Sequence, residues 1–277
     1  MQQLNCALSD GLWDLLQRRS KDANEPVSQI VGSALAAHFG VVHHTLHQVS
    51  TSTALVEGIY QGAVRVGTLR AYGDLGLGTF ENLDGEMAIV DGHVYQVRSD
   101  GSVREVGDDV LSPFAAVTRF DPDARVNLEH CPDFESLLKA FDRLRASENM
   151  FYALRVDGFF DTMHTRVMCK TGEGVPLVQA AAVQPEFNFR NVSGTLVGFW
   201  TPEYAKTLNV PGYHLHFLSE GRTQGGHVLG FSGSGLHLQL QRAADIHIAL
   251  PETEDFLKGN LRRDPSADLA KAETAKK

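Results

Sequence analysis

Short runs of β-type residues interrupted by glycine fill the chain from about residue 46 onward, and this pattern restricts the possible folds more than any other feature. The clearest run is MAIVDGHVYQV, where Asp91-Gly92 separates two alternating segments, which is a strong signal for a β-hairpin. Longer strand-like runs cover residues 150–168 and 236–250. The sequence therefore predicts several antiparallel strands.

Helical patterns are fewer and lie mostly outside these runs. Residues 134–149 (FESLLKAFDRLRASEN) carry apolar side chains at i, i+3, i+4 and i+7, which predicts an amphipathic helix. Two short helices are expected before residue 46, in SDGLWDLLQRR and VSQIVGSALAAHF. The expected fold class is α+β, with strand-rich mixed sheets sharing a core, a few helices and an N-terminal helical appendage.

The expected domain organisation follows from this change of texture. Residues 1–45 form an appendage of unknown role, and residues 46–277 form the main folded unit. That unit could contain two β-rich subdomains, at about 46–190 and 191–277.

Composition narrows the classes of partner and location. A net charge of −9 disfavours nucleic acid and anionic membrane surfaces. No apolar run is long enough to cross a membrane, and the first residues lack the basic start and apolar core of a signal peptide. Three scattered cysteines indicate neither a disulfide framework nor a CxxC metal site. We therefore expect a cytoplasmic protein that binds neither nucleic acid nor membranes.

Three histidines within residues 212–227 are the main candidates for chemistry. Residues i and i+2 of a strand share a side, so His214 and His216 present their imidazoles together while the alternate residues face the core. If residues 218–226 form a loop, His227 opens the returning strand and faces the same pair. Gly225 and Gly226 suit a tight approach of the backbone to a bound ion.

Three neutral imidazoles with an open fourth position are typical of a catalytic zinc site. The alternative is that a His-x-His pattern occurs by chance on a solvent-facing strand. The other histidines favour metal binding less. His43, His44 and His47 fall in the expected linker and should be solvated, whereas His237 and His247 alternate with apolar residues at surface positions.

A glycine-rich stretch at residues 73–92 carries a second group of polar side chains. It does not form a phosphate loop, because Glu81 replaces the third glycine of G-x-G-x-x-G and no helix follows. Thr79, Asp84 and Glu86 stand directly before a predicted strand. Without further information, turn formation at Asp84-Gly85 explains them equally well.

Taken together, several segments resemble the motifs of α-acetolactate decarboxylases. These segments are GTFENLDGE, FYALRVDG, TRV, GTLVGFWTPEYAKTLNVPGYHLHF and GGHV. Their order and spacing extend the resemblance from about residue 46 to the end of the chain, and residues 1–45 fall outside it.

The resemblance implies a set of site residues. The zinc ligands of the family correspond to His214, His216 and His227. Its active-site arginine corresponds to Arg166, and not to Arg155, where the family pattern also admits lysine. Its threonine and first glutamate correspond to Thr79 and Glu86, and a second glutamate near the C-terminus corresponds to Glu273.

The resemblance also implies an activity, the decarboxylation of 2-acetolactate to acetoin and CO₂ by a homodimer. Zinc would act as a Lewis acid that stabilises an enediolate, so no organic cofactor would be required. Arg166 would hold the carboxylate or stabilise the enediolate. Two alternatives remain from the residues alone: a zinc-dependent hydrolase with Glu86 as general base, and a non-catalytic β protein that binds a small ligand.

Overall fold

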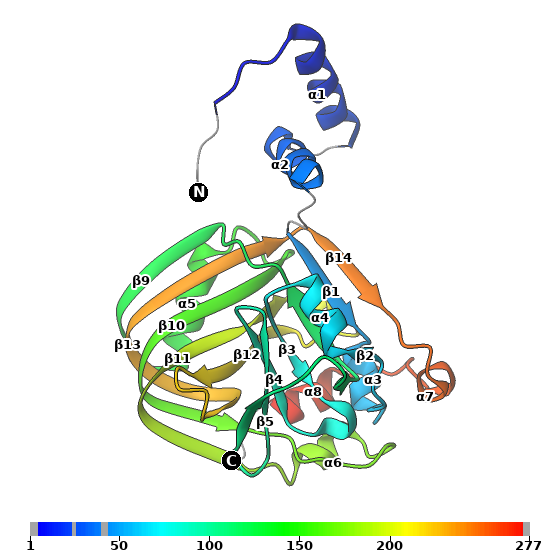
Figure 1. Cartoon of the computed structure of the whole chain (residues 1–277), viewed down its shortest axis with the longest axis vertical. Coiled ribbons are helices and arrows are strands. Elements are labelled where there is room, and N and C mark those ends of the chain that lie inside the picture. Colours follow the sequence, from blue (N-terminus) through cyan, green and yellow to red (C-terminus); the bar gives the residue numbers. More distant parts are fainter. Residues whose placement is uncertain (1–4, 24–25, 40–43, 274–277) are drawn as a thin grey trace. The chain divides into compact units, whose positions relative to one another are not determined.

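The computed structural model describes residues 5–23, 26–39 and 44–273 of the chain. Two compact units follow each other in sequence, residues 1–43 and 44–277 (Figure 1). The first contains α1 (Asp10–Ala23) and α2 (Val27–Phe39). Both helices coincide with the expected segments, and the Ser9 hydroxyl accepts a hydrogen bond from the Leu12 amide at the start of α1.

The second unit is built on two sheets, which lie side by side in Figure 1. The seven-stranded sheet has the order β14 (Asp245–Ala249), β1 (Thr45–Val49), β8 (Ala115–Thr118), β3 (Leu75–Thr79), β4 (Glu86–Val90), β5 (His93–Val97) and β6 (Val103–Glu105). The five-stranded sheet has the order β10 (Phe151–Arg166), β11 (Glu186–Thr201), β12 (Gly212–Ser219), β13 (Gly225–Ala243) and β9 (Ala124–Cys131).

The five-stranded sheet closes partly on itself. Strand β10 pairs along its length with both β11 and β13, and β12 pairs with β11 on one side and with the start of β13 on the other. A small separate ribbon joins β2 (Val64–Arg65) to β7 (Leu111–Ser112).

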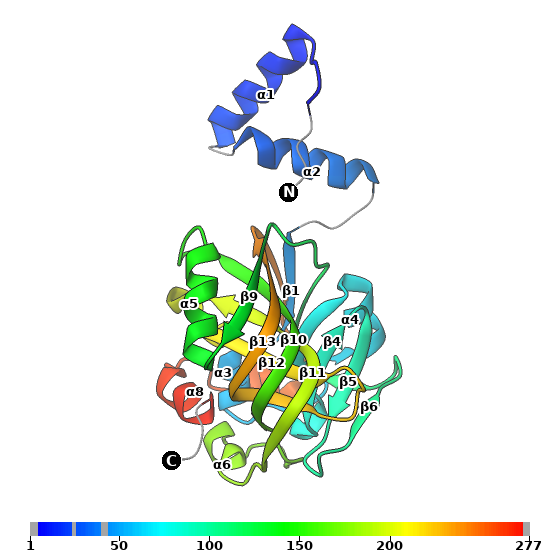
Figure 2. The ribbon, with the colours of Figure 1, turned by 90° about the vertical axis from the view of Figure 1, so that its left-hand side faces the viewer.

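Short helices surround the sheets. They are α3 (Ser52–Val56), α4 (Val66–Tyr72), α5 (Phe134–Leu144), α6 (Leu177–Ala181), α7 (Glu254–Lys258) and α8 (Ser266–Glu273), with 3₁₀ turns at Glu81–Leu83 and Glu203–Ala205. In Figure 2, α5 lies beside β9. Among the described residues, no helix is long and apolar enough to cross a membrane.

The two sheets share an apolar core. Leu46, Leu77 and Ala88 of the first sheet pack in one buried cluster with Val197 and Leu218 of the second. This arrangement confirms the predicted α+β class with mixed sheets around a common core. Residue 190, where the sequence suggested a change of subdomain, lies inside the continuous strand β11.

The β4–β5 turn and the start of α5, which depend on neighbouring residues, form where the sequence predicts them. Asp91 and Gly92 both have positive φ, 53° and 80°, and form the two-residue turn between β4 and β5. Helix α5 begins at the predicted Phe134, where the Asp133 carboxylate accepts a hydrogen bond from the Ser136 amide at 2.8 Å.

The expectation for His47 was wrong. This residue belongs to β1, not to a solvated linker, because β1 pairs with β8 and β14 from distant parts of the chain. Its ring stacks on Tyr72 with centroids 4.5 Å apart, and its Nδ1 lies 3.4 Å from Nδ1 of the exposed His247. His43 lies outside the described residues, and His44 is half-buried beside Asp123.

Candidate metal centre and active site

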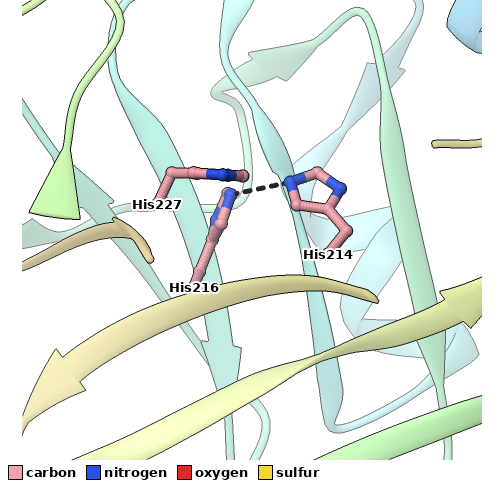
Figure 3. A group of neighbouring side chains, drawn as sticks. All are labelled: His214, His216 and His227. Carbon is pink, nitrogen blue, oxygen red and sulfur yellow. Dashed lines mark hydrogen bonds between the residues drawn. The ribbon is translucent and has the colours of Figure 1, made fainter. Parts of the chain in front are cut away.

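The three predicted histidines converge in one buried cluster (Figure 3). His214 and His216 lie on β12 and His227 lies on β13, with exposed fractions of 9%, 1% and 5%. One nitrogen from each ring lies within 4.8 Å of the others. The dashed line in Figure 3 joins a nitrogen of His214 to a nitrogen of His216, and these two Nε2 atoms are 3.2 Å apart.

Strand geometry explains this convergence. His214 and His216 share one side of β12, while Leu215 and Phe217 on the other side enter the main core of the five-stranded sheet. The chain turns at residues 220–224 and returns as β13, which places His227 directly across the ladder from His216.

The two glycines before His227 are needed for a different reason from the one expected. A Cβ on Gly225 would lie 2.7 Å from the Phe217 carbonyl oxygen, and one on Gly226 would lie 2.7 Å from the Arg166 carbonyl oxygen. Gly226 also has a φ of 134°, which L side chains rarely adopt. These glycines therefore allow close strand packing, which only indirectly positions the imidazole.

The hydrogen bonds and burial favour neutral imidazoles. His216 Nδ1 lies 2.7 Å from the Met87 carbonyl oxygen, so Nδ1–H donates and the Nε2 lone pair faces the cluster. Burial, together with the positive charge of Arg166, lowers the pKa of His214 to about 3. Neutral imidazole is the form that binds metals.

This donor set fits a transition metal. Two ligand nitrogens on a tetrahedral zinc ion are about 3.3 Å apart when each Zn–N bond is about 2.0–2.1 Å. The 3.2 Å between the Nε2 atoms of His214 and His216 is close to that separation. Imidazole also suits copper, iron and nickel, so the cluster indicates a metal without selecting zinc.

Glu86 and Thr79 stand beside the histidines on the neighbouring sheet. They are paired across β3 and β4, and both are buried, each with 6% exposure. Glu86 Oε1 accepts a hydrogen bond from the Met168 amide at 3.0 Å, while Oε2 lies 3.5 Å from His216 Nε2. The Thr79 hydroxyl donates to the Gly85 carbonyl at 2.8 Å and thereby closes the turn that leads to Glu86.

The two arginines lie in different places. Arg166 ends β10 opposite His227, is 3% exposed and lines the same pocket as the histidines. Arg155 lies eleven positions earlier and does not line this pocket. Its Nε donates to Asp157 Oδ2 at 2.7 Å, and its Nη1 donates to Asp91 at 2.5 Å.

The chain folds back toward this pocket near its C-terminus. Leu269 and Ala272 of α8 are each 2% exposed and contribute to the pocket wall. Glu273 is the last residue of α8, and its side chain lies outside the described part of the structure. Its backbone therefore follows directly on a wall residue, and its assigned role stays a prediction.

The pocket encloses about 520 Å³, including its open mouth. Six of the predicted site residues line it: Thr79, Glu86, Arg166, His214, His216 and His227. Sequence reasoning missed the backbone partners Met87 and Met168 and most of the apolar part of the wall. That part consists of Leu55, Leu83, Phe114, Met168, Leu177, Val210, Leu269 and Ala272. Leu83 and Val210 lie inside segments that carry the family resemblance, but nothing in the sequence assigned them to the pocket wall, because its residues come from separate helices and loops.

A buried pocket that combines three convergent imidazoles, a carboxylate and a guanidinium has the composition of a metal-dependent catalytic site. The sequence model of the alpha-acetolactate decarboxylase family matches residues 46–263. The chain therefore belongs to the alpha-acetolactate decarboxylase family, and it is an enzyme of the carboxy-lyase class.

Individual relatives support this assignment. The alpha-acetolactate decarboxylase of Bacillus subtilis is 40% identical over 248 residues, covering 89% of this chain and 90% of that protein. The Methanosarcina mazei protein of the same name is 42% identical over 229 residues, covering 82% and 80%. The crystal structure of the B. subtilis enzyme superposes with a TM-score of 0.81 at 39% identity, covering 83% of this chain and all of that one.

Proposed function

We propose that the protein converts 2-acetolactate to acetoin and CO₂ in the pocket described above. The observation that carries this proposal is the meeting of three buried imidazoles with Glu86 and Arg166 in a member of this family. The relatives named alpha-acetolactate decarboxylase, at about 40% identity, support the choice of substrate.

His214, His216 and His227 would hold a zinc ion, with the Met87 carbonyl fixing the tautomer of His216. A bound zinc ion would supply a Lewis acid toward the keto and hydroxyl oxygens of the substrate. The protein contributes rigid placement of the ligands, because all three side chains are buried between paired strands.

Arg166 is suited to bind the substrate carboxylate. Decarboxylation breaks the bond between the carboxylate carbon and C2, and the electron pair moves toward the former keto group to give an enediolate. The guanidinium of Arg166 offers a planar set of N–H donors and a positive charge, so its role is to hold the carboxylate and not to transfer the proton. In a buried pocket such a charge stabilises both the bound carboxylate and the enediolate.

Glu86 is suited to deliver the proton that C2 needs. The Met168 amide holds one of its oxygens, so the other is directed toward His216 and the pocket. Protonated Glu86 can donate to C2 of the enediolate, which produces acetoin and leaves the carboxylate to be reprotonated from solvent.

The test is incubation of the purified protein with racemic 2-acetolactate, following acetoin and CO₂, beside an activated ester as a hydrolase substrate. Equal amounts of acetoin and CO₂, with no ester hydrolysis above a zinc-only blank, are expected. Ester hydrolysis without acetoin would favour a hydrolase with Glu86 as general base. Substrate binding without either product would favour a non-catalytic binding protein.

Assembly and location are part of the same proposal. We expect a homodimer, as the family resemblance implies, and a cytoplasmic enzyme, as the three unpaired, scattered cysteines favour. Sedimentation of the purified chain tests the first of these expectations.

A further inference from the structure

The pocket has two chemically different sides. Among the residues whose side chains the structure describes, the polar ones that line it all come from strands: Thr79, Glu86, Arg166 and the three histidines. The apolar lining residues form a second side, because they pack in one buried cluster that includes Leu55 from α3, Leu177 from α6, Val210, and Leu269 and Ala272 from α8.

Helix α8 is a packed wall of this apolar side. Leu269 and Ala272 are three residues apart, so they share one face of the helix. They pack in a buried cluster with Leu55 and Leu177.

Ion pairs fix the position of α8. Arg263 contacts Asp268 of α8 at 2.7 Å and Glu57, directly after α3, at 2.9 Å. The Leu269 amide donates to the Pro265 carbonyl at 2.9 Å, which closes the first turn of the helix. Helix α8 is therefore held in place both by the apolar packing of Leu269 and Ala272 and by the ion pairs of Arg263.

This division limits how a substrate can lie. The carboxylate, keto oxygen and hydroxyl of a 2-hydroxy-3-keto acid need hydrogen bonds or charges, which the strand side supplies. Its alkyl groups are the only parts that lose nothing by facing leucine and alanine side chains. They should therefore face the apolar side, to which α8 contributes Leu269 and Ala272.

We propose that Leu269 and Ala272 form an alkyl-binding subsite that sets the largest alkyl group a 2-hydroxy-3-keto acid can carry in this pocket. This inference rests on the proposed function and adds a size limit to it. Leu269 restricts the subsite from the middle of α8, and Ala272, one turn later, leaves space because its side chain is a single methyl group.

The experiment compares Leu269→Ala with the unaltered protein. The substrates are acetolactate and its homologues in which ethyl or propyl replaces one of the two methyl groups, at C2 or next to the ketone. The ratio of kcat/KM for the propyl homologue to that for acetolactate should rise about tenfold or more in one of the two series. The series that responds identifies the alkyl group that faces α8.

Two further variants make the result specific. Ala272→Val should move the ratio in the opposite direction, because it fills the subsite. Leu257→Ala removes an equal volume from an α7 side chain that is 71% exposed, and should leave the ratio unchanged. Thermal unfolding and metal content of each variant show whether α8 is still folded against the body.

An unchanged ratio in folded, metal-loaded Leu269→Ala and Ala272→Val proteins would overturn the subsite. The proposed function fails separately, if the unaltered protein forms no acetoin. In that case calorimetric binding of the unreactive acids 2-hydroxyisobutyrate and 2-hydroxy-2-methylpentanoate still tests the subsite. The quantity to compare is the affinity for the longer acid divided by that for the shorter one. A higher ratio in Leu269→Ala than in the unaltered protein would support the subsite, and the same ratio in both proteins would refute it.

Discussion

At the scale of single residues, side chains with a periodic spacing could be predicted and their partners could not. His214 and His216 were found because a strand places alternate residues on one side. Nothing in the sequence indicated that the Met87 carbonyl would orient His216, or that the Met168 amide would hold Glu86. Each of these contacts joins a side chain to a backbone group, 129 and 82 positions away along the chain. Because every residue type has the same backbone carbonyl, and all but proline the same amide, the sequence does not mark such a partner.

The two arginines should respond differently to lysine. Arg166→Lys should lower kcat/KM for acetolactate by roughly 10²–10³-fold, because an ammonium does not reproduce a planar, buried guanidinium. Arg155→Lys should leave turnover nearly unchanged. It should lower the free energy of unfolding by about 1–2 kcal/mol, because a lysine cannot bond both Asp157 and Asp91 in the same way. Steady-state kinetics and urea unfolding measure the two effects, and equal kinetic losses would refute the assignment of Arg166.

At the scale of elements, predictions succeeded where the determinants are local. The Asp91-Gly92 turn and the capped start of α5 need only neighbouring residues. Prediction failed for β1, whose partners are β8 and β14, about 70 and 200 positions away. The C-terminal helix is an intermediate case, because its polar composition favours fraying while Leu269 and Ala272 pack against the body.

The packing of α8 makes a role for Glu273 testable. Glu273→Gln keeps the size of the side chain and removes its charge, so metal content and thermal stability should be unchanged while acetoin formation falls at least about tenfold. Glu252→Gln, at an exposed position before α7, is the matched control and should be fully active. Normal turnover by Glu273→Gln would leave Glu86 as the carboxylate that carries the chemistry.

At the scale of the whole molecule, the first unit lies outside the residues that the sequence model of the family matches. The match covers residues 46–263, whereas the first unit ends at residue 43. His44 and Thr45 belong to the second unit, because the His44 carbonyl accepts hydrogen bonds from the amides of Ala244 and Asp245 at 3.0 and 3.2 Å. The division between the two compact units therefore falls after residue 43.

A shortened chain that begins at His44 should keep its turnover number, because every residue assigned to the pocket is retained. Steady-state kinetics with acetolactate and metal analysis of both proteins provide the comparison. A folded, metal-loaded shortened chain without activity would show that residues 1–43 contribute to catalysis.

The most direct test of the account measures bound metal and acetoin formation on the same samples of the unaltered protein, His216→Ala and His93→Ala. His93 is an exposed histidine on β5, so its variant controls for the loss of an imidazole as such. The unaltered protein and His93→Ala should bind close to one zinc ion per chain and form acetoin. His216→Ala should bind well under one and form almost none. Full zinc and full acetoin formation by His216→Ala would contradict the account, because the metal and the chemistry would then lie elsewhere.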